Sequence, residues 1–232
     1  MPDITIEAAD GGSFTGYLAR PQSGSGPGVV VIQEIFGVNA GIRDLADGLA
    51  AQGYVVLAPD LFWRQEPGVQ ITDKTEAEWA RAFELLQGFD IDKGILDLKA
   101  TLALLRTMDG VTGKVGTVGY CLGGKLAFLM ATRSDVDAAV SYYGVGLADN
   151  LGEIGSITKP LMLHIAEKDQ FVPPAAQSKI RDALAPLPQV ETHSYAACDH
   201  AFARVGGAHF DAAAATLANQ RTADFLALHL RA

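Results

Sequence analysis

Cysteine is scarce in this chain of 232 residues, which contains only Cys121 and Cys198. Two cysteines cannot build a disulfide framework, and no C-x-x-C pair is present to bind a structural zinc. A chain of this length can bury a core that is stable without such cross-links. We therefore expect a globular protein of the cytoplasm, where thiols stay reduced.

Basic residues are also in deficit, because 18 lysines and arginines face 27 aspartates and glutamates. The net charge of −9 repels nucleic-acid backbones and anionic lipid surfaces, and no local basic run offsets it. The chain has no apolar run near the ~18 residues that span a bilayer. The segment Met1–Glu7 carries acids where a signal peptide carries basic residues. We expect neither a nucleic-acid partner nor a membrane partner.

The composition and length indicate one folded domain. Hydrophobic residues make up 49% of the chain and charged residues 19%, a balance typical of globular proteins. At roughly 150 residues per domain, the length suits a single large α/β domain over residues 1–232. Internal repeats and low-complexity tracts are absent, and Pro21–Gly28 is predicted to be a loop between two strands.

The order of apolar segments predicts the fold class. Ile4–Ala8 and Phe14–Ala19 flank a Gly11-Gly12 turn, which indicates an antiparallel hairpin. Strands and helices then alternate, which predicts a three-layer sandwich with a mainly parallel, twisted sheet. The later strands are expected at Val29–Ile32, Tyr54–Ala58, Val115–Tyr120, Ala138–Tyr143, Pro160–Ile165 and Val190–Tyr195. The helices are expected between Asn39 and Gly53 and at Thr75–Gln87, Asp90–Met108, Leu122–Thr132, Ala175–Leu184 and Ala212–Leu230.

The sharpest motif is Gly119-Tyr120-Cys121-Leu122-Gly123, at a predicted strand-to-helix junction. It is the G-x-S-x-G nucleophile elbow with cysteine in place of serine. An elbow nucleophile sits in a strained turn, where side chains two residues away would clash. Its place at a helix N-terminus favours a thiolate. The alternative, a structural cysteine beside two accidental glycines, is a rare coincidence because only 25 of 232 residues are glycine.

An elbow nucleophile needs a histidine base and an acid that orients it, in the chain order nucleophile, acid, histidine. Asp169 follows the strand Pro160–Ile165, and His200 follows the strand Val190–Tyr195. Both are therefore expected at the sheet edge where Cys121 emerges. Weaker rivals exist for both roles: Glu167 and Asp199 for the acid, and His164, His193, His209 and His229 for the base. Because no two histidines have metal-ligand spacing, we expect neither a metal nor a cofactor.

The segment Gln33–Asn39 follows a predicted buried strand, where this fold supplies its second oxyanion-binding N–H. We expect the backbone amides of Ile35 and Leu122 to be the two donors. Glu34 at the end of that strand must be paired or perturbed in its ionisation.

Two interpretations of Glu34 are open. In the first, its carboxylate forms a salt bridge with an arginine such as Arg43 or Arg204. In the second, it lies beside Cys121 and affects the protonation of the thiol.

Together these motifs resemble the dienelactone hydrolase (carboxymethylenebutenolidase) family, cysteine enzymes of the α/β-hydrolase fold. The segments that carry the resemblance are Gln33–Asn39, Pro59–Leu61, Gly119–Gly124, Tyr142–Gly146, Asp169–Pro173 and His200–Arg204. The resemblance implies a monomeric hydrolase with a triad of Cys121, His200 and Asp169. Its substrate would be a butenolide lactone that bears a carboxylate, formed during the breakdown of catechols.

The resemblance also implies roles in activation and in binding. Glu34 would help to activate the thiol when substrate binds, and Arg204 would hold the substrate carboxylate. The family pattern has a second arginine and a tyrosine on the helix where this chain has Trp79 and Phe83, with Arg81 close by. The expected substrate-binding set is therefore Arg204, Arg81, Phe36, Trp79 and Phe83. Whether Arg81 or Trp79 faces the pocket stays open, and so does the exact substrate.

We interpret the chain as an enzyme that opens an ester or lactone through a thioester with Cys121. Three other functions compete with this interpretation. The chain could hydrolyse ordinary carboxylesters or thioesters, or it could be a binding protein that has kept the pocket. It could also be a redox protein that uses Cys121 and Cys198, although the two cysteines form no C-x-x-C pair.

Overall fold

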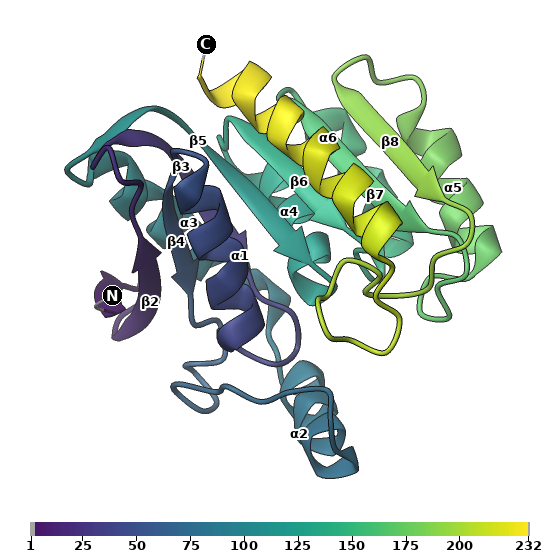
Figure 1. Cartoon of the computed structure of the whole chain (residues 1–232), viewed down its shortest axis with the longest axis horizontal. Coiled ribbons are helices and arrows are strands. Elements are labelled where there is room, and N and C mark those ends of the chain that lie inside the picture. The colour runs from purple at the N-terminus through teal and green to yellow at the C-terminus, as the bar shows by residue number, and fades with distance from the viewer. Residues whose placement is uncertain (1–2, 232) are drawn as a thin grey trace. The chain divides into compact units, whose positions relative to one another are not determined.

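The computed structural model describes residues 3–231 (Figure 1). Met1 and Pro2, which belong to the segment compared above with signal peptides, lie outside the described residues. The chain forms two compact units, the first ending at Val115 and the second beginning at Gly116. The expectation of one domain over residues 1–232 stays a prediction. Within residues 3–231, no helix is both long and apolar enough to cross a membrane.

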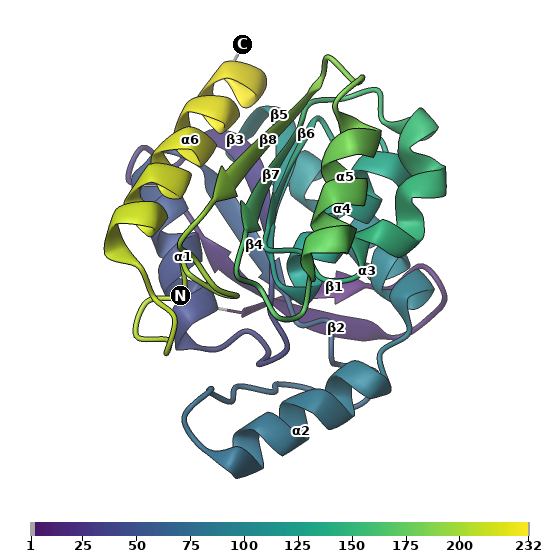
Figure 2. The same cartoon turned by 90° about the vertical axis from the view of Figure 1, so that its right-hand side faces the viewer.

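The first unit contains the predicted N-terminal hairpin. Its strands follow the order β1-β2-β4-β3, in which β1 pairs with β2 and β2 pairs with β4 antiparallel, whereas β4 pairs with β3 parallel. The bounds of these strands are β1 Asp3–Glu7, β2 Ser13–Ala19, β3 Gly26–Ile32 and β4 Val55–Pro59. Helices α1 (Ala40–Ala51) and α3 (Ile91–Thr107) cover opposite faces, and α2 (Glu76–Gln87) stands away from these strands (Figure 2).

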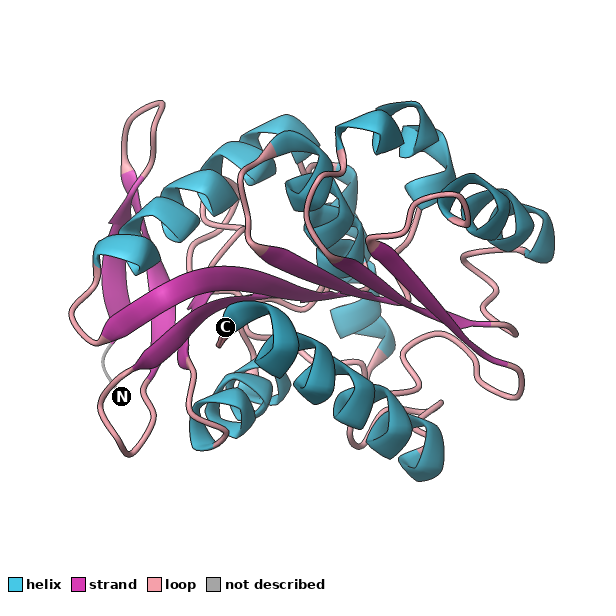
Figure 3. Ribbon diagram, turned by 90° about the horizontal axis from the view of Figure 1, so that it is seen from above, coloured by secondary structure: helices cyan, strands magenta, loops and turns pink. Residues whose placement is uncertain are grey.

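The second unit is built on parallel strands. They follow the order β5-β6-β7-β8, and each adjacent pair in that order is parallel. Helices α4 and α5 lie on one face of these strands and α6 lies on the other (Figures 2 and 3). The bounds are β5 Val111–Tyr120, α4 Leu122–Arg133, β6 Ala138–Tyr142, β7 Leu161–Ala166, α5 Pro174–Leu184, β8 Val190–Tyr195 and α6 Ala212–Leu230. The predicted α/β class is confirmed.

Side-chain caps set the start of most helices. Asn39, Thr75, Asp90 and Asp211 each accept a hydrogen bond from the backbone N–H three residues further on, at α1, α2, α3 and α6. Such a cap satisfies an N–H that has no partner inside the helix. At the start of α4 the capping position is Cys121, whose side chain makes no such bond. The first amides of α4 are therefore left for another acceptor.

Three parts of the fold differ from the prediction, and one of them is the start of β5, which begins at Val111 instead of Val115. Strand β3 begins at Gly26, inside the expected loop, because the Gly26 N–H donates to the Gly110 carbonyl at 2.9 Å. A Cβ at Gly26 would lie 1.9 Å from the Gly53 oxygen, so only glycine lets the strand start there. A 3₁₀ helix, η1 (Leu147–Ser156), was not predicted, since short 3₁₀ turns have no 3.6-residue apolar period.

Candidate active site

Cys121 occupies a sharp turn between β5 and α4. Its backbone has φ of 56° and ψ of −114°, values that a non-glycine residue rarely adopts. The turn is fixed at both ends, because the Cys121 N–H donates to the Tyr142 carbonyl at 3.1 Å and its own carbonyl accepts from the Lys125 N–H at 3.2 Å. This is the geometry expected of a nucleophile elbow, with Leu122 N–H as the first amide of the helix.

The glycines around Cys121 are required by close backbone contacts. A Cβ on Gly119 would lie 1.9 Å from the Gly123 oxygen, inside the turn itself. A Cβ on Gly124 would lie 2.5 Å from the Tyr142 oxygen and 2.8 Å from the Gly144 Cα, where α4 meets β6. The spacing seen in the sequence therefore has a steric cause, and the glycines are not a chance pattern.

His200 and Asp169 form a buried pair in the same unit. The Nδ1 atom of His200 lies 2.7 Å from Oδ2 of Asp169, and both side chains are at most 5% exposed. Oδ1 of Asp169 accepts the Phe171 N–H at 2.8 Å, which fixes the carboxylate plane. Cys121 is the third member of the group, since its charge and a side-chain hydrogen bond both raise the pKa of the His200 imidazole. The second unit thus brings together the three side chains that the sequence singled out.

The charge state of His200 follows from its neighbours. Burial, the largest influence, lowers the pKa of the imidazole, but the negative charge of Cys121 and the hydrogen bond with Asp169 outweigh it. The net effect raises the pKa of His200 from 6.5 to about 10. At neutral pH His200 is therefore an imidazolium that lies between Cys121 and Asp169.

Aromatic rings that sequence reasoning missed enclose the imidazole. The rings of Tyr143 and Phe171 meet the His200 ring edge to face, with centroids 5.2 and 4.9 Å away. Phe171 is 44% exposed, so it stands at the open side of His200. Tyr143 directly follows β6 and has φ of 37°. The only signal in the sequence was that both residues directly follow strand ends or belong to the Asp169–Pro173 segment.

The rival side chains make other contacts. Oδ1 of Asp199 accepts the backbone N–H of His200 at 2.7 Å, and Glu167 is exposed. His209 donates through Nδ1 to the His200 carbonyl at 3.2 Å. Among residues 3–231 no three histidine, cysteine or acidic side chains are grouped to hold a metal ion.

Arg204 lies in the loop that follows His200. Its N–H donates to the Ala201 carbonyl at 2.9 Å, and its carbonyl accepts the Gly207 N–H at 3.0 Å. The stem of its side chain passes over Gly207, where a Cβ would come within 3.3 Å of Cδ. Arg204 thus has a defined position in the second unit, four residues past the base.

The other predicted site residues lie in the first unit. Glu34, Ile35 and Phe36 lie in the segment after β3, beyond Gln33, and are buried, each at most 6% exposed. Arg43, a proposed partner of Glu34, donates through Nε to the Val38 carbonyl at 3.1 Å and lies over the Tyr17 ring, 5.0 Å from its centroid.

On α2 the two alternatives for the pocket residue separate. Trp79 packs against Phe36 and Phe83, with ring centroids 5.0 and 5.6 Å apart. Arg81 forms ion pairs with Glu66 and Glu84. Trp79 and Phe83 therefore continue an aromatic row that begins at Phe36, whereas the Arg81 charge is already neutralised.

Comparison with known proteins identifies relatives across nearly the whole chain. Residues 14–230 match the dienelactone hydrolase family. A relative from Azospirillum brasilense is 56% identical over 232 residues, which cover 99% of this chain and 100% of the relative. The carboxymethylenebutenolidase of Pseudomonas putida is 41% identical over 97% of this chain and 95% of its own. A crystal structure from Klebsiella pneumoniae subsp. pneumoniae superposes with a TM-score of 0.86 at 27% identity, covering 97% of each chain.

Proposed function

Since this chain belongs to the dienelactone hydrolase family, it is a hydrolase of lactone or ester bonds, and we propose that Cys121, His200 and Asp169 are its catalytic residues. One observation carries the proposal. Cys121 stands in a strained elbow and raises the pKa of the His200 imidazole, whose Nδ1 atom bonds to the buried carboxylate of Asp169. Nucleophile, base and orienting acid are thus linked in sequence, which is the arrangement that covalent acyl transfer requires.

In the first half of the reaction the Cys121 thiolate attacks the carbonyl carbon of the substrate. The electron pair of the carbonyl moves to oxygen, and the Leu122 N–H at the start of α4, which has no side-chain cap, would donate to that oxyanion. When the tetrahedral intermediate collapses, the C–O bond breaks and His200 gives its proton to the leaving oxygen. The product is a thioester on Cys121.

The same imidazole then serves as the base. Formation of the thioester consumes the thiolate charge, which is one of the influences that raise the pKa of His200, whereas the burial that lowers it persists. The imidazole can now take a proton from a water molecule, whose oxygen attacks the thioester. Cleavage of the C–S bond releases the carboxylic acid and restores the thiolate beside the imidazolium. The change in charge at Cys121 thus converts His200 from acid to base.

We infer that the substrate is a dienelactone that bears a carboxylate. The Pseudomonas putida relative is named a carboxymethylenebutenolidase, and Arg204 supplies a guanidinium that can bind a carboxylate through two parallel hydrogen bonds. An enolate leaves easily from such a lactone, which suits a thiolate nucleophile. The competing proposal is a general carboxylesterase, which would have no preference for an anionic substrate.

The other roles implied by the family resemblance are proposals too. Glu34 would promote ionisation of the thiol, Ile35 would give the second oxyanion N–H, and the aromatic side chains Phe36, Trp79 and Phe83 would contact the substrate. We also propose that the enzyme works as a monomer in the cytoplasm, in the breakdown of catechols. Glu34→Gln tests the first of these roles, because it should slow acylation while the protein stays folded.

The test of the catalytic residues is the acyl-enzyme itself. With an activated aryl ester, the protein should release one equivalent of phenol in a burst, and mass spectrometry should locate the acyl group on Cys121. Cys121→Ala should abolish both the burst and turnover, because no other nucleophile stands at the elbow. Cys198→Ala is the matched control and should keep most of the activity.

The results also separate the alternatives. An active Cys121→Ala together with an inactive Cys198→Ala would refute the assignment. A stoichiometric Cys121–Cys198 disulfide after mild oxidation, with no burst, would favour the redox protein instead.

A further inference from the structure

A network of buried, hydrogen-bonded polar side chains in the second unit has no part in the mechanism above. At its centre is His164 on β7, which is 1% exposed. Both ring nitrogens are bonded: Nδ1 lies 2.8 Å from the Tyr195 hydroxyl and Nε2 lies 2.9 Å from the Thr222 hydroxyl. Tyr195 belongs to β8 and Thr222 to α6, so the imidazole connects two strands with the helix that covers them.

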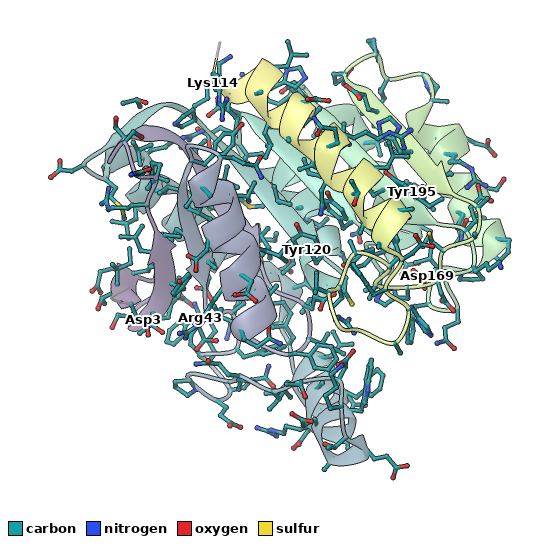
Figure 4. All side chains as sticks on the ribbon, viewed as in Figure 1. Asp3, Arg43, Lys114, Tyr120, Asp169 and Tyr195 are labelled. Carbon is teal, nitrogen blue, oxygen red and sulfur yellow. The ribbon has the colours of Figure 1, made fainter. Side chains whose placement is uncertain are left out.

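The hydrogen-bonded network continues from both of these hydroxyls toward the surface. The Thr222 hydroxyl lies 2.6 Å from the Tyr142 hydroxyl, which donates to Oδ1 of Asn219 at 3.0 Å. At the other end, Nη1 of Arg221 donates to the Tyr195 hydroxyl at 3.2 Å. Both ends of the network therefore lie on α6, and Figure 4 shows the labelled Tyr195 beside that helix.

The donor and the acceptor of every hydrogen bond in this network can be worked out. The Tyr142 hydroxyl donates its one hydrogen to Asn219 Oδ1. The Thr222 hydroxyl must therefore donate to Tyr142. Thr222 then has no proton left for His164, so Nε2 of the imidazole carries a hydrogen and donates to Thr222. Nδ1 is bare and accepts from Tyr195, whose oxygen in turn accepts from Arg221. Each donor is used once.

His164 is neutral in this arrangement. Burial, together with the nearby His193 and Arg221, holds the pKa of its imidazole well below the ordinary value. At neutral pH it is therefore not an acid or base that the reaction could use. A network in which every donor and acceptor is hydrogen-bonded instead fixes the relative positions of the backbone segments that carry it. Apolar packing alone fixes them less strictly.

Two hydrogen bonds between backbone groups connect this network to the proposed catalytic residues. The carbonyl of Tyr142 accepts the N–H of Cys121 at 3.1 Å, and the Tyr142 ring stacks on Tyr120, with centroids 4.7 Å apart. The carbonyl of His164 accepts the N–H of Tyr143 at 2.8 Å, and the Tyr143 ring packs against His200. Tyr142 thus supports the nucleophile, and His164 supports the ring that borders the base.

We propose that Tyr142, Thr222 and His164, with His164 held as the neutral Nε2–H tautomer, form a positioning network that sets the geometry between Cys121 and His200. The proposal rests on the proposed catalytic roles of those two residues. None of the network side chains needs to touch substrate or reacting atoms, so they are positioning residues. Loss of the network should lower kcat and leave KM nearly unchanged, since a small displacement of the nucleophile slows acylation without removing a binding contact.

The first experiment tests the tautomer by NMR of the ¹⁵N-labelled enzyme. His164 should show the Nε2–H pattern of a neutral ring with no titration between pH 5 and 9. Thr222→Val should change that pattern, and Thr222→Ser should restore it because serine keeps the hydroxyl. A titrating His164, or one with its proton on Nδ1, would overturn the proposal.

The second experiment measures the acylation burst and the free energy of unfolding in the same variants. Thr222→Val should slow acylation about tenfold with KM within twofold of wild type, and Thr222→Ser should recover most of the rate. Thr101→Val is the matched control, because the Thr101 hydroxyl is equally buried but donates only to the Asp97 carbonyl of its own helix, at 2.8 Å. It should lose stability and keep the rate.

The outcomes distinguish this proposal from the proposed function. A wild-type acylation rate in Thr222→Val, or a loss no greater than that in Thr101→Val, would refute the positioning role. A wild-type enzyme that forms no thioester on Cys121 would instead refute the catalytic assignment, and with it the role of the network toward catalysis. In that case the NMR result would still decide whether the hydrogen-bonded chain itself exists.

Discussion

Backbone strain in this protein concentrates beside the proposed catalytic residues. Among residues 3–231, the non-glycine residues with positive φ are Cys121, Tyr143 and Ala201. The first is the proposed nucleophile, the second packs against the proposed base, and the third directly follows that base. Such conformations cost roughly 1–3 kcal/mol each and persist only where the surrounding structure enforces them. The local strain therefore marks the same place as the hydrogen bonds.

Asp169 and Asp199 both contact His200, and substitution separates their roles. Asp169→Asn should reduce kcat by about 10⁴-fold while the fold is kept, because an amide at Oδ2 no longer stabilises the imidazolium or its tautomer. Asp199→Asn should have little effect, since an amide oxygen can still accept the His200 N–H. Steady-state kinetics and circular dichroism of both variants check this. If the two variants exchanged these results, the acid would be Asp199.

Arg204 provides a test of substrate charge. If its guanidinium binds the substrate, Arg204→Ala should lower kcat/KM for a carboxylate-bearing lactone, with a loss of transition-state stabilisation of about 2–4 kcal/mol. The same variant should barely affect kcat/KM for a neutral ester. If Arg204 has only a structural role, both substrates should suffer equally and the melting temperature should fall. Kinetics with a matched pair of anionic and neutral lactones distinguishes the two cases. Equal losses would contradict the proposed anionic substrate.

At the scale of elements, the junction of β5 and α4 combines two requirements. For the proposed mechanism, the turn must be tight enough to project Cys121, and the start of α4 must leave amides available for an oxyanion. Glycines at 119 and 124 allow the close backbone contacts, and the absence of a side-chain cap leaves the amides available. The helix forgoes a cap that is worth about 1 kcal/mol elsewhere. It is retained because ten of its residues are buried, Leu122 to Thr132 without Lys125.

The elbow glycine can be tested against a glycine in open surroundings. Gly119→Ala should destabilise the protein by about 3 kcal/mol or more and abolish activity, because its Cβ would lie 1.9 Å from the Gly123 oxygen. Gly152→Ala in η1 should change neither property appreciably, since no atom lies within 4 Å of its Cβ position. Urea unfolding and burst measurements give both quantities. A stable, active Gly119→Ala would disprove the close turn.

At the scale of the whole molecule, His200 makes stability depend on pH. Its pKa is about 10 in the folded protein and 6.5 without its neighbours. Its contribution to the free energy of unfolding is therefore fully present below about pH 6.5 and is lost as the pH rises toward 10. Taken alone, the titration of His200 lowers the unfolding free energy by up to about 1.4 kcal/mol per pH unit over that range.

Urea unfolding of wild type and His200→Gln between pH 6 and 10 measures this slope. The variant should show a flatter dependence on pH, whatever its absolute stability. A His200→Gln slope equal to that of wild type would contradict the imidazolium described above.

Much of this protein could be predicted from the sequence because the signals are local. Continuous β-branched runs such as Val29–Ile32 and apolar stripes predicted the strands and helices, and their alternation predicted the α/β class. The elbow around Cys121 needs particular residue types at adjacent positions, so it too is visible in the sequence. The chain order of Cys121, Asp169 and His200 followed from the fold that this motif indicates.

Only the tertiary structure decided which distant side chains meet. The hydrogen bond from His200 to Asp169 joins residues 31 positions apart, and the bond from His164 to Thr222 joins residues 58 apart. A local pattern predicts such contacts only when it also indicates the fold, as the elbow motif does for His200 and Asp169, because they depend on which strands become neighbours and in what register. For the same reason the sequence indicated His164 only as a weaker rival for the catalytic base. The register that pairs it with Tyr142 on β6 makes it the centre of a polar network.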